Sequence, residues 1–125
     1  MTVPKIAESE WRVMKILWEK SPITANEIVG KLADYTRWNP KTIRTLLNRL
    51  VAKGAIGFEK DGRTYLYYPI LPKSECARLE RRSLLSKVYD GALKPMLAAF
   101  IQEEHLSREE IQELKNILEQ KGKNI

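Results

Sequence analysis

Residues 39–54 carry the stretch that decides the fold of this chain, NPKTIRTLLNRLVAKG. Asn39 is a preferred N-cap residue, Pro40 suits the first helical position, and Gly54 can adopt the left-handed conformation that ends many helices. From Ile43 to Val51, apolar residues recur at i, i+3, i+4, i+7 and i+8. This spacing predicts a helix with one apolar face.

The opposite face of this predicted helix carries only cations and neutral polar groups. No Asp or Glu occurs between Tyr35 and Phe58, whereas the polar face of an ordinary surface helix mixes both signs of charge. Long cations and short polar groups suit phosphates and base edges. We therefore predict a DNA recognition helix, with a solvated basic helix as the alternative. The residues expected to face base edges are Lys41, Arg44 and Thr45, with Thr42, Asn48 and Arg49 supporting them or contacting phosphates.

The composition favours an intracellular protein with a polyanionic partner. The chain has 125 residues, a formal charge of +6 and a single cysteine, so a disulfide within the chain is excluded. Residues 1–71 hold 12 Lys and Arg against 7 Asp and Glu, whereas residues 72–125 hold 10 against 9. The positive field therefore belongs to the N-terminal part. With no apolar run of about 20 residues and no signal peptide, we expect a soluble, cytoplasmic protein without a membrane partner.

Two helices are predicted before the basic one. Residues 8–20 place Trp11 and Trp18 on one apolar side, which is typical of core anchors. Thr24 and Glu27 then form a capping box, and the second helix continues to about Ala33. Residues 1–7 are expected to form a short extended arm. Two helices followed by a turn and a basic helix indicate a helix-turn-helix module.

A β-hairpin is predicted after the basic helix. Residues 55–60 and 64–70 alternate apolar and polar positions, and Asp61-Gly62 is a favoured two-residue turn. Lys60 and Arg63 flank the tip, where they can reach DNA, while the tyrosines fit either sheet packing or DNA contact. The fold class is therefore mainly α with a small β-hairpin: a winged helix over residues 1–71.

Residues 72–121 are predicted to form three further helices, followed by a polar tail at residues 122–125. About fifty residues in amphipathic helices cannot enclose much core. The simplest partner is the same segment of a second chain, forming a twofold dimer; packing back on the winged helix is the alternative. The expected dimer residues are Leu85, Val88, Tyr89, Met96, Leu97, Phe100, Ile101, Ile111, Leu114, Ile117 and Leu118.

The sequence offers no catalytic or metal-binding constellation. His105 is the only histidine, and no motif places a nucleophile beside it. Cys76 has the simplest interpretation of a small, partly buried residue. We therefore expect neither an enzyme nor a cofactor.

The assembled motifs resemble the penicillinase-repressor family, the BlaI/MecI type of winged-helix regulator. The resemblance is carried by residues 10–14 with Trp18, by residues 24–28, by residues 40–54, and by residues 87–91 and 106–114. It implies a dimeric repressor on palindromic operators with TACA/TGTA-like half-sites, controlling β-lactam-resistance genes. It also implies a sensor-linked protease that cleaves the fifth helix between the residues matching Ala99 and Phe100. Where the family has asparagine, this chain has Ala99.

We therefore expect a homodimeric transcriptional repressor that binds double-stranded operator DNA. The competing hypothesis is a winged-helix module whose basic face binds RNA or an acidic protein.

Overall fold

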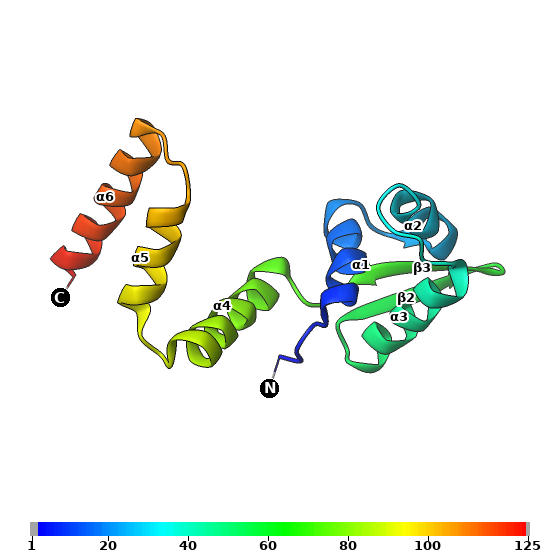
Figure 1. Ribbon diagram of the computed structural model, residues 1–125. Helices are drawn as coiled ribbons and strands as arrows, with labels where there is room; N and C mark the ends of the chain where they lie inside the picture. The colour runs from blue at the N-terminus through cyan, green and yellow to red at the C-terminus, as the bar shows by residue number, and fades with distance from the viewer. Residues whose placement is uncertain (1–2, 125) are drawn as a thin grey trace. The chain divides into compact units, whose positions relative to one another are not determined.

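Within residues 3–124, which the computed structural model describes, the chain forms six helices and three strands (Figure 1). The helices are α1 (Glu8–Glu19), α2 (Ala25–Leu32), α3 (Pro40–Ala52), α4 (Lys73–Tyr89), α5 (Leu93–Glu103) and α6 (Arg108–Lys123). The strands are β1 (Ile23–Thr24), β2 (Ile56–Asp61) and β3 (Thr64–Pro69). The predicted arm and tail include Met1, Thr2 and Ile125, which lie outside the described residues.

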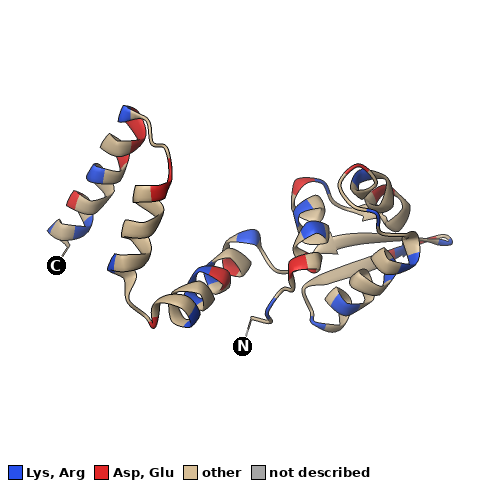
Figure 2. Cartoon of the chain, viewed as in Figure 1, with Lys and Arg blue, Asp and Glu red and all other residues tan. Residues whose placement is uncertain are grey.

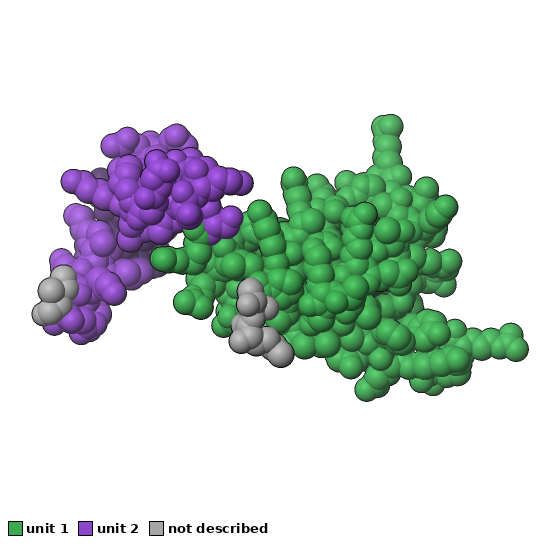
Figure 3. All heavy atoms as spheres, turned by 90° about the horizontal axis from the view of Figure 1, so that it is seen from below, with its two compact units in different colours: residues 1–82 green, residues 83–125 purple. Residues whose placement is uncertain are grey.

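The chain divides into two compact units, residues 1–82 and residues 83–125 (Figure 3). This boundary lies within α4, later in the chain than the predicted boundary at 71/72. The reason is that Cys76 is buried in the core of the first unit. Two tryptophans of α1 also form hydrogen bonds with residues 71–80. Trp18 Nε1 donates to the Leu71 carbonyl at 2.9 Å, and Trp11 Nε1 donates to Glu80 Oε1 at 3.5 Å.

The first unit is a winged helix built around one apolar core. Helices α1, α2 and α3 each bury most of the apolar stripe that their sequence spacing predicts. Trp11 and Trp18 of α1 and Val51 of α3 are only partly buried and pack against the core. The capping box of α2 is confirmed, because Thr24 Oγ1 accepts from the Glu27 N–H at 3.1 Å and Glu27 Oε1 accepts from the Thr24 N–H at 3.3 Å. Ala55 and Ile56 close the core from the β2 side.

The sheet has three antiparallel strands in the order β1-β3-β2. Strand β1 was not predicted; its Ile23 pairs with Tyr67 and is fully buried. The predicted Asp61-Gly62 turn is wrong by one residue, because Asp61 pairs with Thr64 and leaves Gly62-Arg63 as the turn. Gly62 has φ +65°, whereas the φ of Arg63 is negative. A positive φ at the first turn residue alone is the pattern of a type II′ turn.

The second unit holds the end of α4 together with α5 and α6. Asp90 and Gly91 have positive φ and end α4, where the Gly91 N–H donates to the Leu85 carbonyl at 3.0 Å. Ser107 caps α6 by accepting from the Glu110 N–H at 3.0 Å. The predicted polar tail at residues 122–125 begins too early, because α6 continues through Lys123.

Candidate nucleic-acid interface

Helix α3 begins and presents its polar face as the sequence predicts. Asn39 Oδ1 accepts from the Thr42 N–H at 2.9 Å, and Pro40 occupies the first turn. Ile43, Leu46, Leu47 and Leu50 are buried, and their burial fixes which side of the helix meets solvent. On that outer side, Thr42 is half-buried and the other predicted contact residues are exposed. Those residues are Lys41, Arg44, Thr45, Asn48 and Arg49.

A groove of about 410 Å³ lies between α3, the N-terminus of α2 and the wing, which is the hairpin of β2 and β3. It brings together three of the predicted residues: Arg44 and Asn48 from α3, and Arg63 from the wing turn. The remaining predicted residues lie outside its lining. Lys60, on the same face of the hairpin as Tyr65, is exposed and pairs with it in the ladder.

Six further residues line this groove: Thr24, Ala25, Asn26, Thr64, Tyr65 and Tyr67. From the sequence, the tyrosines fitted either sheet packing or DNA contact, and the other four were not predicted to lie at the interface. The first three stand at the start of α2, and the capping box could have pointed to them because it marks a helix N-terminus, where the first backbone N–H groups have no partner within the helix. The two tyrosines could not be assigned, since only the pairing register decides which sheet face they occupy.

Tyr67 lines the groove from the sheet side. It lies on the central strand, opposite Ile23 on one side and Phe58 on the other. Burial raises the pKa of its phenol, Tyr65 raises it further, and the nearby Arg44 guanidinium opposes them. Tyr67 is therefore a neutral hydroxyl at physiological pH, able to donate a hydrogen bond beside Arg44.

The electrostatics of the groove suit a polyanion. Its described lining contains Arg44 and Arg63 and no carboxylate. Figure 2 shows Lys and Arg along α3 with no acidic residue on that helix. Cations and hydroxyl and amide groups in one open groove match a sugar–phosphate backbone and the base edges beside it.

The residues that the structure describes contain no cluster of side chains suited to catalysis or metal binding. His105 is exposed and Cys76 is buried. Among residues 3–124, no three His, Cys, Asp or Glu side chains are grouped so as to hold a metal ion. Across the same residues, no helix has the length and apolar character needed to span a membrane.

The residues expected at a dimer interface differ in their exposure within the single chain. Leu85 and Met96 are each only 9% exposed. Tyr89 is half-buried. The other eight are at least 37% exposed: Val88, Leu97, Phe100, Ile101, Ile111, Leu114, Ile117 and Leu118.

Comparison with known proteins places this architecture in a family. The sequence profile described as Penicillinase repressor matches residues 6–120. The chain is 40% identical to the penicillinase repressor of Bacillus licheniformis over 118 residues, covering 94% of this chain and 92% of the relative. It is 38% identical to the methicillin resistance regulatory protein MecI of Mammaliicoccus sciuri over 117 residues, covering 94% and 95%.

A solved structure supports the same assignment for the winged helix. The solution structure of monomeric Bacillus licheniformis BlaI in complex with the blaP half-operator is similar with a TM-score of 0.52 and 40% identity. That similarity covers 59% of this chain and 90% of the solved one. This chain therefore belongs to the penicillinase repressor family, whose members are winged-helix DNA-binding transcriptional repressors and not enzymes.

Proposed function

We propose that this protein represses transcription in the cytoplasm as a homodimer bound to an inverted-repeat operator. Helix α3 enters the major groove, where Lys41, Arg44 and Thr45 read base edges. The wing residues Lys60 and Arg63 bind the phosphates of the DNA backbone. The observation that carries this proposal is the groove in which Arg44 and Asn48 of α3 face Arg63 of the wing without a carboxylate in its described lining. The half-operator complex of the 40% identical relative supports it.

The second unit supplies the dimer contact in this proposal. Its exposed apolar side chains on α4, α5 and α6 leave a surface that a single chain does not cover. A second copy presents the same side chains and can cover them with twofold symmetry. Two recognition helices related in this way would lie about one DNA turn apart, roughly 34 Å, or a multiple of it.

Our proposals for the target genes and the inducing step rest on the relatives' names and on the family resemblance. We propose operators of β-lactam-resistance genes and inactivation by a sensor-linked protease at Ala99-Phe100. Both residues lie inside α5, where the Phe100 carbonyl accepts from the Glu104 N–H at 3.0 Å. Because this segment is helical, α5 must unwind locally before a protease can bind it in extended form.

Substitution of Arg44 and Arg63 tests the assignment of base and backbone contacts. Arg44→Ala should weaken the free energy of binding to a duplex with inverted TACA/TGTA-type half-sites by about 1–3 kcal/mol, because it removes a base contact. The loss of binding to random duplex should be much smaller. Arg63→Ala should weaken binding to both duplexes alike, because it removes a phosphate contact. It should also lower the slope of log affinity against log salt concentration by about one unit. Binding titrations across a salt series measure both effects.

Equal losses on the two duplexes for Arg44→Ala would contradict the base-reading role. RNA of equal length that competes as well as the operator duplex would instead favour the RNA-binding alternative.

A further inference from the structure

One ion pair, between Glu10 and the partly exposed Lys53, joins the recognition helix to the first helix. Glu10, on the first turn of α1, is fully buried. Its Oε1 accepts from the Ala7 N–H at 2.8 Å and from Lys53 Nζ, which also donates to the Lys5 carbonyl at 3.0 Å. Lys53 is the C-cap residue of α3. The N-terminal arm, α1 and the end of α3 are thus tied at one point.

This pair is a costly way to hold two helices together. Helices α1 and α3 already pack through apolar side chains such as Met14, Leu47 and Leu50. Removing a carboxylate from water is expensive, and an apolar pair of similar volume is often as stable or more so. Within the described residues, Glu10 Oε2 lacks a hydrogen-bond partner, so the carboxylate is also incompletely compensated. Stability alone therefore does not explain why these two residues are charged.

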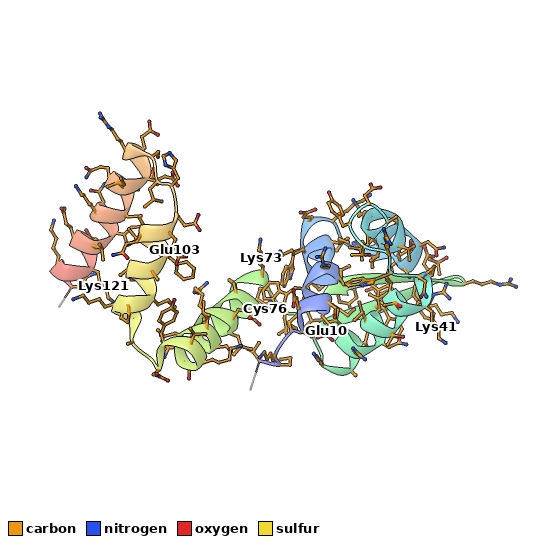
Figure 4. All side chains as sticks on the ribbon, viewed as in Figure 1. Glu10, Lys41, Lys73, Cys76, Glu103 and Lys121 are labelled. Atoms are coloured by element: carbon orange, nitrogen blue, oxygen red, sulfur yellow. The ribbon has the colours of Figure 1, made fainter. Side chains whose placement is uncertain are left out.

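Unlike an apolar contact, the ion pair fixes the orientation of one helix relative to the other. Apolar surfaces allow a helix to tilt or slide by small amounts, whereas a charged hydrogen bond holds two atoms at a set distance and angle. Lys53 and Lys41 stand at opposite ends of α3, about 18 Å apart at a helical rise of about 1.5 Å per residue. Figure 4 shows Lys41 at the end of α3 away from Glu10. A tilt of about 5° at the Lys53 end would move the Lys41 end by roughly 1.6 Å, which exceeds the tolerance of a hydrogen bond.

We infer that Glu10 and Lys53 are positioning residues for the recognition helix: the pair sets the angle at which α3 meets DNA and thereby sets sequence selectivity. This inference rests on the proposed role of α3 as the base-reading helix. Neither residue lines the groove, so the pair acts through the orientation of α3.

The test replaces the pair with an apolar pair, Glu10→Leu with Lys53→Met, in the full-length protein. This double substitution removes one negative and one positive charge, so the net charge and the attraction to random DNA are unchanged. The inference predicts a thermal midpoint at or above that of the unsubstituted protein. It also predicts unchanged affinity and salt slope on random duplex, and roughly tenfold weaker binding to the duplex with inverted TACA/TGTA-type half-sites.

Glu10→Gln is the conservative control, because its amide oxygen can still accept from Ala7 and Lys53. It should keep the operator-to-random affinity ratio within about threefold of the unsubstituted value, a change below 1 kcal/mol. An unchanged ratio in the double variant would overturn the inference, and so would failure of that variant to fold or a reduced ratio in Glu10→Gln.

Arg44→Ala separates this result from the proposed function. If Arg44→Ala lowers the operator-to-random ratio and the double variant does not, α3 reads bases but the ion pair does not position it. If Arg44→Ala leaves the ratio unchanged, the base-reading role itself fails.

Discussion

Ile117 on α6 gives a quantitative test of the dimer surface. Its side chain is 64% exposed in the single chain. Ile117→Ala removes three carbon atoms, worth about 2.4 kcal/mol if fully buried, at about 0.8 kcal/mol each. Scaling by the exposed fraction that a partner would cover gives about 1.5 kcal/mol. A twofold dimer contains the substitution twice, so dimerisation should weaken by about 3 kcal/mol, roughly a hundredfold in Kd.

Sedimentation equilibrium of the full-length protein measures this change directly. Alanine has a higher helix propensity than isoleucine, so α6 itself should not be weakened. Ile70→Ala is the matched control, because Ile70 is 54% exposed but lies in the first unit; its dimer Kd should match that of the unsubstituted protein. A dimer Kd for Ile117→Ala within about threefold of the control value would refute the assignment of α6 to the interface. An unsubstituted protein that is monomeric at micromolar concentration would refute the dimer altogether.

Two further predictions concern titratable groups. Burial raises the pKa of the Cys76 thiol, and Glu75 and Glu80 raise it further. Native protein at pH 8 should therefore react with an aromatic disulfide reagent on the order of a hundredfold more slowly than protein in denaturant. Equal rates would show that the core of the first unit does not enclose Cys76. The Ser107 N–H donates to Glu110 Oε1 at 3.0 Å and holds the pKa of that carboxyl below its usual range. A lowered folded-state pKa stabilises the fold at neutral pH and loses that contribution as the pH falls through it. Glu110→Gln keeps the capping box and should remove this part of the acid dependence of helicity, measured by circular dichroism; an unchanged acid titration would contradict the role of Glu110.

The sequence by itself determined the helices and the carboxylate-free polar face of α3, because the decisive signals are local. A cap such as Asn39 acts on the N–H three residues ahead, and the apolar spacing of Ile43 to Val51 fixes one buried face whatever the partner is. The absence of carboxylates from Tyr35 to Phe58 can be counted without coordinates. The resemblance carried by residues 40–54 and by the C-terminal motifs also indicated the family that the relatives show.

Only the tertiary structure decided features that join residues distant in sequence. Strand β1 has two residues, too few to show a period, and exists because β3 pairs with it. The hairpin turn shifted to Gly62-Arg63 because strand pairing set the register, and both Asp61-Gly62 and Gly62-Arg63 contain a glycine that tolerates positive φ.

The boundary within α4 and the pairing of Glu10 with Lys53 have the same origin. Cys76 belongs to the first unit because its side chain is buried in the apolar core of that unit, which no composition shift near Pro72 could reveal. Glu10 in an amphipathic helix looks like a solvated residue, and only the packing of α3 against α1 encloses it and brings Lys53 to it across 43 positions of sequence. Local periodicity determines which face of an element is buried, but the contact between two buried faces is set by how the whole chain packs.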